Sequence, residues 1–180
     1  TDGSPLALPS WMSPSSVHRT RIKICGLTRE ADVDAAVEAG ADAIGLVLYD
    51  TSPRYVDAVR AGVLARRLPP FVTPVVLLVN ASPSLVQAAL DAVPHALLQF
   101  HGDETPAQCE VVGRPYVRAA RMAPGFDLLD FTLSFASAQA MLVDAHVEGY
   151  GGGGQVFDWS LLPRQLSRPM ILSGGLHPGN

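Results

Sequence analysis

Residues Arg21–Thr28, with the sequence RIKICGLT, predict the first unit of an α/β fold. Polar and apolar residues alternate up to Cys25, as they do in a half-buried strand. Gly26 then predicts a turn, and Thr28 followed by Glu30 predicts the start of a helix. The Cys25 thiol is therefore expected at the carboxyl end of a strand, where α/β proteins gather ligands and catalytic groups. The alternative, a small buried residue, describes most free cysteines.

The same pattern of a strand followed by a helix recurs along the chain. Strands are predicted at Ile22–Cys25, Ala43–Val47, Pro74–Val79, Ala96–Phe100, Tyr116–Ala119, Ala140–Val143 and Pro169–Leu172. Helices are predicted at Glu30–Ala39, Asp57–Leu68 and Phe126–Ser137, and two more begin at Ser82-Pro83 and at the capping box Thr105–Gln108. The strands recur roughly every 20 to 30 residues, which is the length of one βα unit.

Repeated βα units predict a parallel sheet that either stays open or closes into a barrel. A doubly wound nucleotide-binding sheet should carry GxGxxG after its first strand, and no such pattern follows Cys25. Gly-rich segments instead come late in the chain, where barrels place a phosphate site. We therefore expect an α/β (βα)8 TIM barrel, truncated after its seventh strand because the sequence ends at Asn180. The barrel domain is expected at 21–180, lacking its C-terminal βα unit, after a disordered N-terminal tail at 1–20.

Composition argues against several classes of function. The net charge is −4 and no basic block occurs, so nucleic acid is not an expected partner. No apolar run approaches the roughly 20 residues of a membrane span. Cys25 and Cys109 are far apart and lack metal-ligand spacing, so no metal site is expected. We expect a cytoplasmic protein with reduced thiols.

A carboxylate follows the sixth predicted strand, in Leu142-Val143-Asp144-Ala145. Asp144 should lie at the same mouth as Cys25, and an acid facing a thiol suits proton transfer between two atoms of a substrate. Alternatively, Asp144 caps the following loop through backbone amides. His101, after the fourth strand, should face this mouth too, and its ordinary pKa near neutrality suits acid–base chemistry.

Two Gly-rich segments are candidate phosphate sites. Gly151–Gly154 would expose backbone N–H groups and allow close approach of a ligand, although a flexible linker has the same composition. Gly174 and Gly175 follow the seventh strand, where a Gly-Gly turn forms either a phosphate cradle or an ordinary βα turn.

Five motifs, in this order, resemble the phosphoribosylanthranilate isomerase family of tryptophan biosynthesis. They are Lys23–Thr28, Ser52–Val56, Gln99–Glu104, Asp144 with Gly151–Gly154 and Phe157-Asp158-Trp159, and Ser173–Leu176 with Pro178 and Asn180. The resemblance covers Ile22 to Asn180. It implies an Amadori rearrangement that converts N-(5-phosphoribosyl)anthranilate to 1-(2-carboxyphenylamino)-1-deoxyribulose 5-phosphate, an isomerisation that needs no metal and no organic cofactor.

The resemblance also implies roles for individual residues. Asp144 would be the general acid that protonates the furanose ring oxygen, and Cys25 the general base that removes the C2 proton. Arg54 would bind the anthranilate carboxylate, although a solvated loop arginine is the commoner case. The remaining substrate-binding residues would be His101, which shapes the site, and the phosphate-binding glycines Gly152, Gly154, Gly174 and Gly175.

The chain departs from the family pattern in two places. Gly153 stands where family members usually have Thr or Ser. The family also continues beyond Asn180 to an eighth strand, so we expect the chain as given to be weakly active or inactive. We also expect it to be less stable than a form extended by one more βα unit, or else to self-associate. The family includes monomers and dimers, which leaves a homodimer open. The alternatives are another sugar-phosphate isomerase or an inactive phosphate-binding barrel remnant. Cys25 argues against the bifunctional histidine and tryptophan pathway barrel, which has an acid at that position.

Overall fold

The computed structural model describes residues 19–145, 156–163 and 166–180. Its strands are β1 (Lys23–Cys25), β2 (Ala43–Val47), β3 (Thr73–Leu78), β4 (Leu97–Phe100), β5 (Tyr116–Met122), β6 (Ala140–Ala145) and β7 (Met170–Leu172). Its helices are α1 (Glu30–Glu38), α2 (Ala58–Ala65), α3 (Pro83–Ala92), α4 (Pro106–Glu110), α5 (Leu128–Ser134) and the 3-10 helix η2 (Trp159–Leu161). The tail predicted at 1–20 lies outside the described residues except for its last two.

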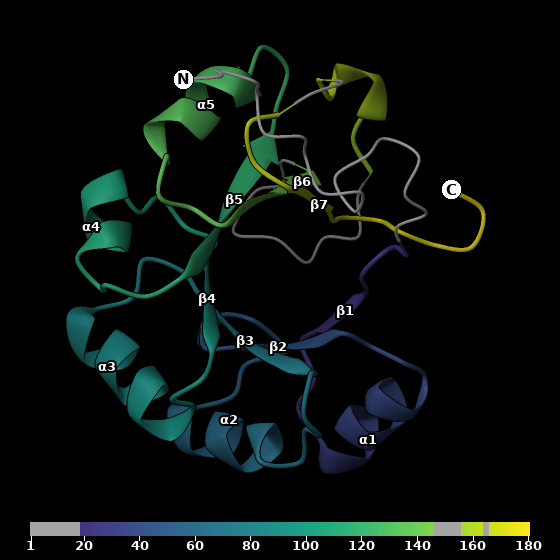
Figure 1. The fold of residues 1–180 in the computed structure, drawn as a ribbon, viewed down its shortest axis with the longest axis vertical. Coiled ribbons are helices and arrows are strands. Elements are labelled where there is room, and N and C mark those ends of the chain that lie inside the picture. Colours follow the sequence, from purple (N-terminus) through teal and green to yellow (C-terminus); the bar gives the residue numbers. More distant parts are fainter. Residues whose placement is uncertain (1–18, 146–155, 164–165) are drawn as a thin grey trace, which may run out of the picture.

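The strands form a single parallel sheet in the order of the chain, from β1 to β7. The sheet curves, and helices α1 to α5 lie along its outer side (Figure 1). Within the described residues β1 and β7 are the two edges of the sheet. This is the parallel barrel architecture that the sequence predicts, and each of the seven expected strands is present.

Capping residues explain where most helices begin. The Ser82 hydroxyl accepts from the Leu85 N–H at the start of α3, and Thr105 and Gln108 form the predicted capping box of α4. The helix predicted at Glu30–Ala39 is confirmed as α1, but its N-cap residue is Arg29, with no side-chain cap, and Thr28 does not cap it. The guanidinium of Arg60 instead joins this end of α1 to α2, since it donates to the Thr28 carbonyl and to the Glu30 carboxylate.

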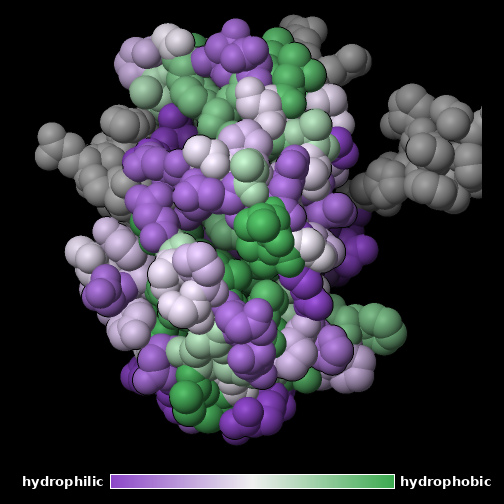
Figure 2. Space-filling view, turned by 90° about the vertical axis from the view of Figure 1, so that its left-hand side faces the viewer, coloured by the Kyte–Doolittle hydropathy of each residue, from purple (hydrophilic) through white to green (hydrophobic). Residues whose placement is uncertain are grey.

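Two apolar layers hold the sheet in place. The larger lies between the sheet and the helices and contains Val33, Ile44, Leu46, Leu64, Val76, Leu78 and Leu98, all fully buried. The other lines the concave side of the sheet and includes Val117 and Leu142 from β5 and β6. On the helical face in Figure 2, patches of hydrophobic residues are separated by hydrophilic ones. The core therefore positions the carboxyl ends of the strands, while the outer face is an ordinary mixed surface.

Candidate active site

A cavity of about 1370 Å³ lies on the concave side of the sheet. It brings together six of the eight residues that the sequence predicts for a site, namely Cys25, Arg54, His101, Asp144, Gly174 and Gly175. The other two, Gly152 and Gly154, lie outside the described residues.

Among the described residues, no group of three His, Cys, Asp or Glu side chains is placed to hold a metal ion. None of the described helices is long and apolar enough to cross a membrane.

The Cys25 thiol is the last side chain of β1 and lies beside a glycine of β2. Cys25 pairs with Gly45 in the strand register and packs against the cluster of Val47, Leu77 and Val79. A Cβ atom at Gly45 would lie 2.5 Å from the Cys25 Sγ and 3.1 Å from its Cα. The absence of a side chain at Gly45 therefore creates the space that the thiol occupies.

We expect Gly45→Ala to lower kcat by at least about tenfold, because displacing a reacting group by about 1 Å is enough for such a loss. The expectation applies to the isomerisation that the sequence resemblance implies. Its control is Gly113→Ala, where no neighbouring atom lies within 4 Å; the φ of +63° there should make the methyl cost stability, but kcat should not change because the thiol is not displaced. A Gly45→Ala enzyme with unchanged kcat would show that the position of the thiol is unimportant.

Arg54 reaches Cys25 from the loop after β2. Its Nη1 donates to the Cys25 carbonyl over 3.3 Å, and its backbone N–H donates to the Ser52 hydroxyl. Gly26 makes room for it, since a Cβ there would lie 2.4 Å from the Arg54 Cδ. Gly26 also has a φ of +87°, which glycine adopts readily. No carboxylate in the described part of the chain pairs with this half-buried guanidinium, so it is available to an anionic ligand.

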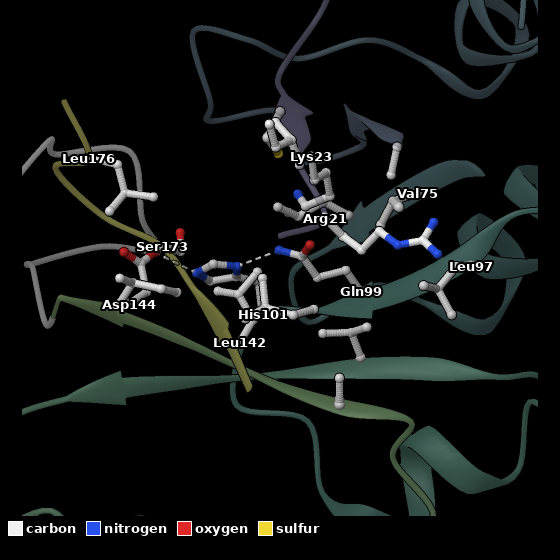
Figure 3. Close-up of a pocket in the computed structure, with 18 of the residues that line it drawn as sticks. Arg21, Lys23, Val75, Leu97, Gln99, His101, Leu142, Asp144, Ser173 and Leu176 are labelled. Carbon is white, nitrogen blue, oxygen red and sulfur yellow. Dashed lines mark hydrogen bonds and ion pairs between the residues drawn. The ribbon is translucent and has the colours of Figure 1, made fainter. Parts of the chain in front are cut away.

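The side chains of Asp144 and His101 contact each other in the cavity. Asp144 lies near the end of β6 and His101 directly follows β4, with β5 between the two strands. Asp144 Oδ1 accepts from the Ala145 N–H over 2.9 Å, and Oδ2 lies 3.2 Å from His101 Nε2. The Gln99 amide then donates through Nε2 to His101 Nδ1 over 2.9 Å (Figure 3). The capping alternative for Asp144 therefore holds for one oxygen, while the other faces His101.

Gly174 and Gly175 follow β7 and also line the cavity. Their φ angles are +80° and +60°, and Asn180 donates to the Gly175 carbonyl. Successive backbone N–H groups in this region of φ can form an anion-binding concavity. The arrangement suits a phosphate near the last described turn.

A buried ion pair, not predicted from the sequence, holds the loop that carries His101. Glu104 accepts from the backbone N–H groups of Asn80 and Gly102, at 2.7 and 2.9 Å. Arg118 lies 3.3 Å from Glu104 and donates to the carbonyls of Phe100 and Gly102. Burial lowers the pKa of Arg118, and the carboxylate beside it opposes that effect.

Glu104→Gln should destabilise the fold by about 3 kcal/mol, because it leaves the buried Arg118 guanidinium without its counter-charge. Urea unfolding would measure the loss. The matched control is Asp32→Asn, which removes an exposed partner of Arg29 and should change stability little. Equal effects of the two substitutions would contradict a special role for the buried pair.

Comparison with known proteins gives a single, consistent family. The family model for "N-(5'phosphoribosyl)anthranilate (PRA) isomerase" matches residues 22–180. The N-(5'-phosphoribosyl)anthranilate isomerase of Leptothrix cholodnii is 71% identical over 162 residues, which are 90% of this chain and 74% of that protein.

Solved structures of the same name share the fold. A phosphoribosyl anthranilate isomerase in complex with reduced 1-(o-carboxyphenylamino)-1-deoxyribulose 5-phosphate has 32% identity and a TM-score of 0.77, covering 90% of this chain and 79% of that one. A structure of monomers generated from the dimeric Thermotoga maritima enzyme has 30% identity and a TM-score of 0.76, covering 90% and 78%.

Proposed function

This chain belongs to the phosphoribosylanthranilate isomerase family, and we propose that the cavity beside β1 and β6 is where it isomerises N-(5'-phosphoribosyl)anthranilate. The product is 1-(2-carboxyphenylamino)-1-deoxyribulose 5-phosphate. The observation that carries the proposal is a free thiol, Cys25, and a buried carboxylate, Asp144, in one cavity at the carboxyl ends of their strands. The direct test is turnover of the fluorescent anthranilate substrate by the purified protein.

The proposed reaction needs only proton transfers. Asp144 gives its proton to the furanose ring oxygen, which also takes the electron pair of the breaking C1–O bond, and the ring opens to a Schiff base. The Cys25 thiolate then removes the proton from C2. The resulting enolamine gains a proton at C1 and loses the one on its hydroxyl, which leaves a ketone at C2. C1 is reduced and C2 is oxidised within one molecule, so no external oxidant is required.

The other proposed contacts follow the charges of the substrate. Arg54 binds the anthranilate carboxylate, because its guanidinium has no carboxylate partner among the described residues and lies beside Cys25. Gly174 and Gly175 bind the phosphate, together with Gly152 and Gly154. His101 shapes the site through its contact with Asp144.

Arg54→Ala is expected to weaken binding of an anthranilate-bearing ligand by about 10-fold or more, the value of a charge-assisted hydrogen bond. Binding of inorganic phosphate should hardly change, because Gly174 and Gly175 remain. Titration calorimetry with both ligands checks this. Arg66→Ala at the C-terminal cap of α2, outside the cavity lining, is the control. Equal losses for both ligands would instead indicate a general electrostatic role.

Assembly, domain limits and location complete the proposal. A homodimer is supported by the dimeric relative from Thermotoga maritima, and light scattering of the purified protein would test it.

The catalytic domain is proposed at 21–180, with 1–20 as a tail that can be removed without loss of turnover. The cytoplasm is the proposed compartment, because Cys25 and Cys109 are free thiols.

A further inference from the structure

Gln99, His101 and Asp144 form a row of buried polar side chains along the cavity. Gln99 and His101 are two residues apart at the end of β4, so they lie on the same side of the sheet, and Asp144 comes from β6 with β5 between them. Their exposed fractions are 1%, 5% and 7%. Figure 3 shows the His101 ring between the other two side chains. With so little access to water, the contacts within the row determine where its protons lie.

The Gln99 amide determines which nitrogen of the His101 ring carries the proton. Gln99 Nε2 donates to His101 Nδ1 over 2.9 Å, so Nδ1 is an acceptor. A neutral imidazole with an acceptor at Nδ1 carries its proton on Nε2. Nε2 is the nitrogen that lies 3.2 Å from Asp144 Oδ2. The proton of His101 therefore faces the carboxyl group of Asp144.

We propose that Gln99 is a positioning residue for the isomerisation, which holds His101 in its Nε2–H tautomer so that Nε2–H stabilises the Asp144 carboxylate formed during ring opening. This inference rests on the proposed role of Asp144 as the general acid. When Asp144 gives its proton to the ring oxygen, negative charge develops on its two oxygens. Oδ1 already accepts from the Ala145 N–H, and Nε2–H supplies a donor for Oδ2. Gln99 and His101 neither gain nor lose a proton.

The geometry indicates a bond that forms as charge develops. The contact between Nε2 and Oδ2 is within ion-pair distance, yet Nε2 makes no hydrogen bond with any of the described residues. A small rotation of the Asp144 carboxyl group would complete the bond, and catalytic hydrogen bonds commonly tighten as the reaction proceeds. An interaction made mainly in the transition state raises kcat and leaves KM little changed.

The Gln99 amide is paired through its nitrogen alone, which is unusual for a buried amide that serves only stability. Its Oε1 is buried and has no partner in the described part of the chain. Buried amides that serve stability usually have both polar atoms paired. Cys25, Lys23 and Arg54 line the same cavity, but no hydrogen bond or ion pair between the described residues joins them to His101. The Gln99 bond to Nδ1 is therefore the contact that sets the tautomer.

Nitrogen-15 NMR of the His101 ring tests the tautomer directly, with the signals assigned by their loss in His101→Asn. The unmodified enzyme should show a protonated Nε2 and an unprotonated Nδ1. Gln99→Leu should give a mixture of tautomers, and Gln99→Glu should place a proton on Nδ1, because a carboxylate accepts from it. Thr132→Val is the control, since it removes a different buried hydrogen bond, to the Leu128 carbonyl in α5.

Kinetics test the consequence of the tautomer. Gln99→Glu should lower kcat about tenfold, as expected for loss of one charge-assisted hydrogen bond. Gln99→Leu should lower kcat by less, because part of its His101 keeps the Nε2–H tautomer, and KM should stay within about twofold in both variants. Thr132→Val should keep both parameters. A protonated Nδ1 in the unmodified enzyme, or an unchanged kcat in Gln99→Glu, would overturn the inference. The NMR needs no substrate, so it decides the tautomer even if the unmodified enzyme has no turnover, a result that would contradict the proposed function instead.

Discussion

Asp144→Asn is expected to lower kcat by at least about 10²-fold, the low end of the range for general acid–base catalysis. The carboxamide has no acidic proton to give to the ring oxygen. It can still accept from the Ala145 N–H, as Asp144 does over 2.9 Å, so the loop after β6 should keep its local geometry. The loss should therefore be confined to the chemical step. Steady-state kinetics with the anthranilate substrate would measure it.

The control for this substitution is Asp130→Asn. Asp130 lies on the outer helix α5, so the same loss of charge there should leave kcat unchanged. Circular dichroism and urea unfolding establish that both variants are folded. A folded Asp144→Asn enzyme with near-normal kcat would mean that another group protonates the ring oxygen.

The architecture was predictable because its signals are local. Alternation up to Cys25 located β1, and the Gly and capping signals located most helix ends, such as Ser82 before α3. The helix predicted at Phe126–Ser137 is shorter in the structure, where α5 spans Leu128–Ser134. The start of α1 at Glu30 was predicted correctly, but the contact of Arg60 in α2 with Glu30 and with the Thr28 carbonyl was not. That contact depends on packing of α1 beside α2 and not on the local sequence.

The supporting residues of the site were harder to predict for the same reason. Cys25, His101 and Asp144 each lie at the carboxyl end of a strand or directly after it, which is a signal that the sequence carries. Gln99 belongs to the motif Gln99–Glu104, but the motif assigned it no role, although its spacing of two residues from His101 places both on one side of the strand. Gly45 matters only because β2 lies beside β1, where a methyl would meet the Cys25 sulfur at 2.5 Å. Relations between strands cannot be obtained from either strand by itself.

Cys25→Ala should lower kcat by at least about 10²-fold, because no thiolate remains to remove the C2 proton. The truncation is expected to spare the fold, since Cys25 is only half-buried at the end of β1. Binding of a product-like anthranilate ligand should be retained, because the Arg54 contact to this position uses the backbone carbonyl and not the thiol. Loss of kcat with retained ligand binding is what distinguishes a base from a binding residue.

Cys109→Ala gives the matched control for the loss of a thiol. Cys109 is fully buried on α4, and burial raises its pKa to about 11, so it should not be thiolate at neutral pH. Its truncation should cost stability through the cavity that it leaves but should not change kcat. Iodoacetamide tests the same difference between the two thiols. It should alkylate Cys25 and so inactivate the unmodified enzyme, and it should leave Cys109 unmodified. If Cys25→Ala retained near-normal kcat while folded, the C2 proton would have to leave to a different base, and the role proposed for Cys25 would be wrong.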